Sequence, residues 1–252
     1  MQILYDNLFA KDTLAGFALS SSGDESGFPV ENIADWLDFD HWMGVPDSDN
    51  IAYVEVQFTS AQPANTFAIY GHDLATNSGS VKCRRYNSGS WTQVGTTLTP
   101  TEDGLSIIQF AEVSDTRWRL EFTSNPASYI GFGFIGKALA LPAPLTGFMP
   151  PLVPPTTSEV NRAVNGALLG VYGYPNVGDI KAEFEWQTPS WVRSYWVPFM
   201  QHAQRKAFVV AWNDDDLSEA WWCWSEKPME NPKYETADWM SVKLVCRCTD
   251  GQ

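Results

Sequence analysis

Five aspartates crowd one stretch of the N-terminal half: Asp35, Asp38, Asp40, Asp47 and Asp49. Carboxylate oxygens that a loop brings together are the ligands that Ca²⁺ prefers, so Asp35, Asp38 and Asp40 form a candidate Ca²⁺ site. Their spacing matches no fixed ligand loop, and a solvated acidic loop is the competing interpretation. Paired carboxylates also perform acid–base catalysis in glycosidases, which requires a cleft around them. We predict no other metal or cofactor.

Motifs of the common enzyme classes do not occur in the sequence. The three histidines, His41, His72 and His202, lack the i, i+4 spacing of a helical zinc site, and no phosphate-binding loop or nucleophile elbow occurs. Gly131-x-Gly133-x-x-Gly136 has the dinucleotide spacing, but a proline-rich run follows it where a helix should begin. We therefore predict a protein that is not an enzyme, with His72 as a turn histidine bonded to backbone.

Four cysteines, Cys83, Cys223, Cys246 and Cys248, are scattered in the sequence. Cys246 and Cys248 lie two apart in an alternating segment, so both point to one face of a strand. Neither Cys-x-x-Cys nor paired Cys/His spacing occurs, which disfavours a zinc site. We predict buried, reduced thiols in a chain made in the cytosol.

A group of aromatic residues near the C-terminus comprises Trp212, Trp221, Trp222 and Trp224. Successive strand residues point to opposite faces, so Trp221 and Trp222 cannot share one core. We therefore expect one of these faces to meet another domain or another subunit, and the four tryptophans are candidate interface residues.

The net charge of −14, from 16 basic and 30 acidic residues, limits the partners. Such a surface repels phosphate backbones and anionic membranes, so we expect no direct nucleic-acid or membrane binding. No apolar run approaches the about 20 residues that span a bilayer. Residues Met1 to Asp6 lack the basic and apolar regions of a signal peptide, so we expect no secretory signal.

Alternating segments predict strands throughout the first part of the chain. They span residues 51–58, 66–70, 81–86, 91–94, 117–122 and 129–135. Asn87-Ser88-Gly89-Ser90 predicts a hairpin turn between two of them. Short strands at this spacing, with no helical stretch between them, indicate an antiparallel β-sandwich over residues 1–140.

A proline-rich run, residues 141–157, follows the predicted sandwich. Such a run is stiff and extended, so we expect it to space two domains. Residues 158–252 predict a smaller β-rich domain, with strands at 180–187, 208–212, 220–224 and 239–248. One short helix is predicted at about 197–205, with Ser190 as a candidate N-cap of the wider segment 191–205 and Pro198 interrupting it.

The segment Phe28-Pro29-Val30-Glu31-Asn32-Ile33-Ala34-Asp35, followed by Trp42 and strand 51–58, resembles the opening of discoidin-like (galactose-binding-like) domains. Arg117-Trp118-Arg119-Leu120 resembles a late strand of the same sandwich. The resemblance covers about residues 28–140 and implies a jelly-roll sandwich whose first loops often hold a structural Ca²⁺.

In discoidin-like sandwiches, the loops that would carry Trp36, Phe39 and Trp42 rim the ligand face. Exposed aromatic rings stack on sugars or anchor a protein interface. Together with Arg84 and Arg85, Trp36 and Trp42 form a candidate glycan-binding set. The competing interpretation is that Trp42 plugs the end of the sandwich.

Other segments resemble tail proteins of tailed phages. Gly71-His72-Asp73-Leu74 is similar to a turn of tail-associated proteins, and Ile130–Leu139 resembles their closing strand. Glu185-Trp186, a helix and then Ala207–Asn213 resemble the body of siphophage distal-tail or tail-tip proteins. The resemblance implies a ring-forming virion component with an outer sandwich domain.

We therefore expect a structural tail subunit of the distal-tail or tail-tip type, assembled in the host cytoplasm and located in the virion tail. Its expected partners are copies of itself in a ring, neighbouring tail proteins and, through the sandwich, a cell-surface glycan. The alternative function is that of a carbohydrate-binding module protein that recognises glycans through the sandwich loops.

Overall fold

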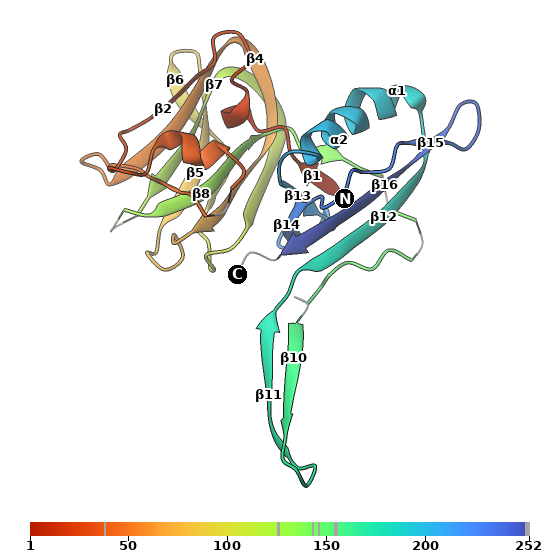
Figure 1. Cartoon of the computed structure of the whole chain (residues 1–252). Coiled ribbons are helices and arrows are strands. Elements are labelled where there is room, and N and C mark those ends of the chain that lie inside the picture. Colours follow the sequence, from red (N-terminus) through yellow and green to blue (C-terminus); the bar gives the residue numbers. More distant parts are fainter. Residues whose placement is uncertain (38, 125–126, 143, 146, 154–155, 250–252) are drawn as a thin grey trace.

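A computed structural model describes residues 1–37, 39–124, 127–142, 144–145, 147–153 and 156–249. Figure 1 shows two β-rich bodies side by side and a two-stranded hairpin that projects from one of them. All pairings between the described strands are antiparallel. The predicted fold class, mainly β with an N-terminal sandwich and a smaller β-rich part with one helical segment, is confirmed. No described helix is long and apolar enough to cross a membrane.

The sandwich has the strand order β3-β8-β4-β7-β5-β6, with β2 paired to β4. Its strands are β2 (Ala18–Ser21), β3 (Trp42–Met43), β4 (Ile51–His72), β5 (Ser80–Asn87), β6 (Ser90–Leu98), β7 (Ser106–Thr123) and β8 (Tyr129–Gly136). Two 3-10 turns precede β3, η1 (Leu8–Ala10) and η2 (Val30–Ala34). Register shifts in the middle of the β4–β7 pair bend both strands. The first half of β4 also pairs with β2 and the second half with β8, so the bent pair contributes to both layers.

The predicted strands 51–58 and 66–70 are the two ends of β4. The sandwich core contains the residues that the alternation of the first segment indicates: Ala52, Val54, Val56 and Phe58. The predicted hairpin turn joins β5 and β6, and Gly89 has a φ of +86°, which glycine adopts without steric cost.

The second body is a sheet in the order β12-β16-β14-β13-β1-β9, with β15 paired to β16. Its strands are β1 (Gln2–Leu4), β9 (Leu139–Ala140), β12 (Gly178–Gln187), β13 (Phe208–Ala211), β14 (Ala220–Trp224), β15 (Lys233–Tyr234) and β16 (Met240–Thr249). A helical segment covers one face, where Phe199 meets Trp196 and Phe208 edge to face. Aromatic pairs of this kind add about 0.5–1.5 kcal/mol beyond their burial.

The first strand of the chain belongs to the second body. β1 lies between β13 and β9, although β9 directly follows the sandwich. We predicted residues 1–140 as the sandwich, whereas residues 2–4 and 139–140 pair in the other sheet. A strand of two or three residues is too short to show a period of two, so the sequence pattern does not mark it.

The helical segment comprises α1 (Pro189–Trp191), a π-turn (Val192–Trp196) and α2 (Val197–Ala203). Regular helix begins at Val197, beside Pro198, as predicted. Proline lacks an N–H and its ring clashes with the preceding turn, so the backbone before it departs from a regular α-helix. The N-cap is Thr188, whose hydroxyl oxygen accepts the N–H of Trp191 at 3.2 Å. The predicted N-cap, Ser190, lies inside the first turn instead.

The proline-rich run 141–157 does not hold the two bodies apart. In its described part, the N–H of Leu141 donates to the carbonyl of Met1 and the N–H of Leu145 to that of Glu183, both at 2.9 Å. Residues 143, 146, 154 and 155 lie outside the described residues. The run follows the second sheet, and the two bodies meet directly through a shared buried cluster.

A hairpin arm extends from the second body. It consists of β10 (Thr156–Arg162) and β11 (Leu168–Pro175), which pair only with each other among the described strands. Figure 1 shows the arm projecting away from both bodies. We did not predict this hairpin, although Asn165-Gly166, with Gly166 at a φ of +84°, is typical of a hairpin turn.

Candidate functional site

Trp42 closes one end of the sandwich. Its side chain is 1% exposed, packs against Phe122 and donates from Nε1 to Oδ1 of Asp24 at 2.9 Å. Asp24 also accepts the hydroxyl of Ser21 and the N–H of Val30. A ring held in this way is not open to a sugar, so the structure places Trp42 in the plugging role of the competing interpretation.

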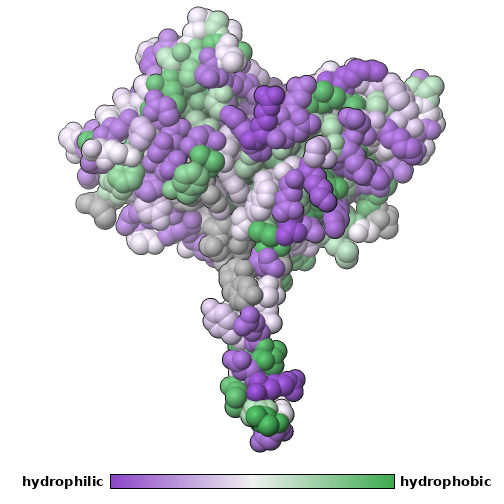
Figure 2. Space-filling view, in the orientation of Figure 1, coloured by the Kyte–Doolittle hydropathy of each residue, from purple (hydrophilic) through white to green (hydrophobic). Residues whose placement is uncertain are grey.

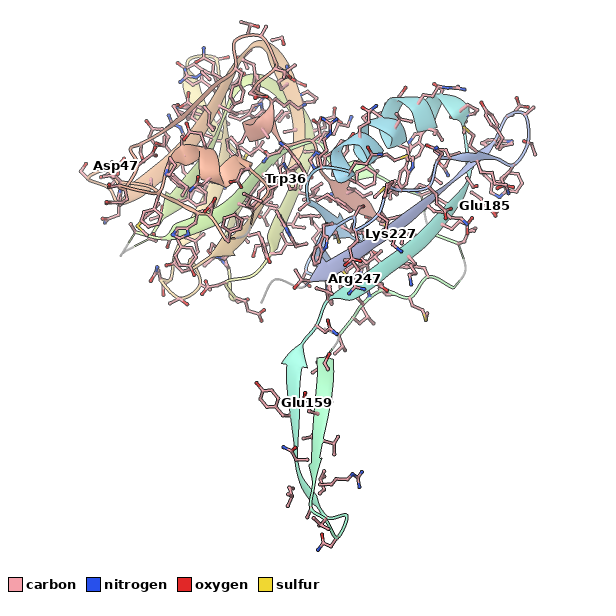
Figure 3. The ribbon with its side chains drawn as sticks, viewed as in Figure 1. Trp36, Asp47, Glu159, Glu185, Lys227 and Arg247 are labelled. Carbon is pink, nitrogen blue, oxygen red and sulfur yellow. The ribbon has the colours of Figure 1, made fainter. Side chains whose placement is uncertain are left out.

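Trp36 lies between the two bodies. Its side chain is 3% exposed, and its ring centroid is 4.4 Å from that of Phe132 in β8 and 5.7 Å from that of Trp222 in β14. Figure 3 shows Trp36 on the side of the sandwich that faces the second body. Of the three predicted loop aromatics, Phe39 is the one that reaches solvent.

One buried cluster joins the two bodies. Trp222 stacks on Tyr70 with 4.8 Å between ring centroids and meets Phe132 edge to face at 4.9 Å. The buried members of the cluster come from both bodies: Leu4, Trp36, Ala68, Tyr70, Ile107, Phe132, Phe134, Ala138, Val209, Ala211, Ala220 and Trp222. Each Å² of apolar surface that they bury contributes about 25 cal/mol, so the contact resists separation of the bodies.

Both faces of β14 pack against other parts of the same chain. Trp221 points into the core that the helical segment covers, and Trp222 points the opposite way into the shared cluster. Trp224 packs at the margin of that cluster, and Trp212 donates from Nε1 to Glu219 at 2.9 Å. The face expected to meet another domain therefore meets the sandwich, and these tryptophans give no reason to expect a second subunit.

Arg84 and Arg85 form ion pairs within the sandwich. Nε of Arg84 lies 2.7 Å from Oε2 of Glu121, and Nη1 of Arg85 lies 3.8 Å from Oδ2 of Asp115. The structure therefore does not bring the predicted glycan set together: its tryptophans are buried and its arginines are paired.

An arginine–aromatic face covers the outer side of β4 to β7 and consists of Tyr53, Tyr86, Trp91, Arg117 and Arg119. The guanidinium of Arg119 lies 3.9 Å from the Tyr53 ring centroid and 4.1 Å from that of Trp91. Arg117 lies 4.4 Å from the Tyr86 ring centroid. Glu55 accepts hydrogen bonds from both arginines, at 2.8 and 2.7 Å. All five residues are partly exposed, so this face presents rings to solvent that the sequence did not single out.

The described candidate Ca²⁺ ligands, Asp35 and Asp40, belong to no cluster of three metal-binding side chains among the described residues. Asp35 accepts the N–H of Leu37 at 2.8 Å, and burial, with the charge of Asp40 nearby, raises the pKa of the Asp35 carboxyl. Asp38 lies outside the described residues. Within the described part of the chain, no three His, Cys, Asp or Glu side chains gather closely enough to hold a metal ion.

The cysteines and His72 have the predicted structural roles. All four cysteines are free and buried, and burial raises the pKa of the Cys83 and Cys223 thiols. Nδ1 of His72 accepts the N–H of Leu74 at 3.3 Å, and burial lowers the pKa of this histidine.

The hairpin arm is the candidate functional element. Apolar side chains at least half exposed along it are Val160, Val164, Leu168, Leu169, Val171 and Tyr172. Val160 and Val171 are cross-strand partners on one face, and Leu168, opposite Arg162, continues that face beyond a bulge at Leu169. Figure 2 shows apolar surface at the end of the arm, away from both bodies. The aliphatic side chains among them belong to none of the buried clusters of the described residues.

No family model and no curated protein matches the chain. Among solved structures it is similar to a pectin-binding carbohydrate-binding module (22% identity, 50% of this chain and 93% of that chain, TM-score 0.40). It is also similar to chitosan-binding module 1 of a chitosanase/glucanase from Paenibacillus sp. IK-5 (19%, 51% and 96%, TM-score 0.40). A third is the family 32 carbohydrate-binding module of Streptococcus pneumoniae EndoD (13%, 49% and 97%, TM-score 0.39).

These similarities concern a fold that covers about half of the chain, and at these values they carry no argument about function. None of the three is a phage tail protein.

Proposed function

We propose that this protein is a non-enzymatic subunit that assembles with copies of itself, and that the hairpin arm joins the copies. The arm is the observation that supports this. A two-stranded hairpin is marginally stable at best in water, and this one exposes apolar side chains and unpaired backbone edges. Contact with a neighbouring copy would cover both.

The charge distribution supports contact between like copies through the arm. Among residues 156–175 the charged side chains are Glu159 and Arg162, so the arm is neutral while the chain carries −14. Copies repel one another through much of their surface but not through the arm. Figure 3 shows Glu159 on the arm, well away from both bodies.

We further propose that the assembly is the tail of a tailed phage, with this subunit in a distal-tail or tail-tip ring. The support is the resemblance of segments 71–74, 130–139 and 207–213 to such proteins. Neighbouring tail proteins are then further partners, and the virion tail is the location after assembly in the host cytoplasm. A surface of negative charge is compatible with DNA passing without adhesion.

Size-exclusion chromatography with light scattering tests the arm. The full chain should form oligomers, and Leu169→Asp and Val171→Asp should return it to monomers without lowering the melting temperature. Leu14→Asp, which charges an exposed aliphatic position outside the arm, is the matched control and should keep the oligomer. A wild-type chain that stays monomeric and is absent from virions would refute the proposal.

Glycan recognition by the sandwich is a second candidate function, and the arginine–aromatic face favours it. Aromatic rings stack on sugars, and guanidinium groups donate bidentate hydrogen bonds to carboxylates. One chain can combine both functions, because the arm and this face are separate surfaces.

A glycan array tests the second candidate. Binding by the wild-type chain should be lost in Trp91→Ala, because Trp91 carries a central ring of the face. Trp186→Ala removes an exposed tryptophan of the other body and should retain binding. If the wild-type chain bound no glycan, or if Trp91→Ala bound as well as wild type, this candidate would be withdrawn.

A further inference from the structure

Strand β12 ends in a strained bulge that exposes a tryptophan. Its pairing with β16 shifts register between Phe184 and Gln187, and within this bulge Trp186 has a φ of +59°. The left-handed region is unfavourable for a bulky side chain, and residues held there cluster at functional sites. The Trp186 side chain is 59% exposed, so core packing does not account for its conformation.

Two more exposed aromatic residues lie at the same end of the sheet. Trp239 meets Trp186 edge to face with 6.4 Å between ring centroids, and Tyr234 accepts a hydrogen bond from Nη2 of Arg193 at 2.9 Å. Tyr234 and Gln187 pair with Met240 from its two sides, which brings β15 and the end of β12 together. The three exposed rings form an aromatic platform: Trp186, Tyr234 and Trp239.

The arm and the platform lie at opposite ends of β12. β11 ends at Pro175, just before β12 begins at Gly178, whereas Trp186 is the penultimate residue of β12. A strand of this length spans about 33 Å, and the arm points away from the platform (Figure 1). The arm therefore cannot reach the platform of its own chain.

We propose that the aromatic platform of one copy binds the arm of the next through the arm face formed by Val160, Leu168 and Val171. This inference rests on the proposed self-assembly and names its receiving surface. These three side chains are aliphatic, and Arg162 lies beside them on the same face, so docking on aromatic rings buries apolar area and places one cation where ring faces can accept it. Two different surfaces that join copies head to tail produce a ring when the rotation closes.

Trp186→Gly separates binding from folding. Glycine adopts a φ of +59° without steric cost, so the variant should melt at the same or a higher temperature than wild type. The dissociation constant of its oligomer should nevertheless be at least about 10-fold higher than that of wild type, which is the loss of affinity typical when a buried aromatic anchor is removed. Trp91→Ala, on the sandwich, is the control and should leave oligomerisation unchanged.

Cysteine pairing identifies the two surfaces in contact. The four native cysteines are buried, so an added surface cysteine is the reactive one. Ser158→Cys suits the arm because Ser158 is exposed and lies two residues from Val160 on the same face, and Asp238→Cys lies beside Trp239. Mixed under mild oxidation, the two variants should form disulfide-linked heterodimers, whereas Ser158→Cys mixed with Asp49→Cys should not.

The outcomes distinguish this inference from the proposed function. Oligomers that are lost with Val171→Asp but survive Trp186→Gly, without a link between positions 158 and 238, would overturn the platform and leave assembly by the arm standing. A wild-type chain that remains monomeric would overturn both.

Discussion

Asn7 is a buried residue whose side chain ties the η1 turn to β8. Its Nδ2 donates to the carbonyl of Gly133 at 2.8 Å, and its Oδ1 accepts the N–H groups of Phe9 and Ile135 at 3.2 and 3.3 Å. No motif in the sequence marks this role, because the partners lie more than a hundred residues away. An asparagine in a turn looks the same in sequence whether its side chain meets water or backbone.

We predict that Asn7→Ala lowers the free energy of unfolding by about 2–3 kcal/mol, because it leaves buried backbone groups without partners. Urea denaturation followed by fluorescence measures this loss. Asn231→Ala, at an exposed position, should stay within about 0.5 kcal/mol of wild type. Equal losses in the two variants would contradict the role of Asn7.

Two histidines should make the protein less stable in mildly acidic solution. Burial lowers the pKa of both His72 and His202. Above about pH 6.5 each is neutral in the folded and the unfolded chain. As the pH falls further, the unfolded chain binds protons that the folded chain excludes. Stability then falls by up to about 1.4 kcal/mol per pH unit for each histidine.

His202→Gln tests this at one site, since an amide can still hydrogen-bond the carbonyl of Ala207. We expect the melting temperature to fall less in the variant than in wild type when the pH is lowered from about 7.5 to about 5.5. These two values lie on either side of the ordinary histidine pKa. A fall of equal size in both proteins would show that His202 does not contribute.

At the scale of elements, the start of the helical segment depends on Thr188. Thr188→Ala should cost about 0.5–2 kcal/mol, because the N–H of Trp191 loses its acceptor. Ser190→Ala is the matched control and should have a smaller effect, since Ser190 lies inside the first turn. Thermal unfolding of the two variants checks this, and the reverse order would restore Ser190 as the cap.

Elements with a sustained alternation were predictable from the sequence, and short or isolated ones were not. Segment 180–187 was predicted and forms most of β12, and segment 239–248 likewise corresponds to β16. β1 is too short to show a period. The hairpin arm was not predicted because residues on both of its faces are exposed, so its sequence shows no alternation between buried and exposed positions.

At the scale of the molecule, the shared cluster should make the two bodies unfold together. Trp222 is 4% exposed and contacts Tyr70 and Phe132 of the sandwich. We predict one calorimetric transition for the wild-type chain and two for Trp222→Ala, which removes about 3–5 kcal/mol from the contact. Trp186→Ala should retain one transition. Two transitions already in wild type would show that the contact does not couple the bodies.

The placement of the candidate site residues follows from this contact, and sequence patterns could not supply it. The alternation of Trp221 and Trp222 correctly required two apolar environments, but it could not identify the second as a neighbouring part of the same chain. The expected position of Trp36 in an open loop is wrong for the same reason: its burial depends on Trp222, which lies more than a hundred residues further along the chain.

The pairing of β1 constrains the order in which this protein can be built. β1 is translated before the sandwich, yet Ile3 pairs with Val210, so the second sheet stays incomplete until β13 has been translated. The sandwich, whose last strand ends at Gly136, can fold before that, while β1 and β9, which pair with each other, still lack the rest of their sheet. It is in effect an insertion between two strands of the other sheet. Proteolytic cleavage in the proline-rich run would accordingly produce two fragments. The N-terminal fragment would carry β1 and β9, which complete the sheet of the C-terminal fragment.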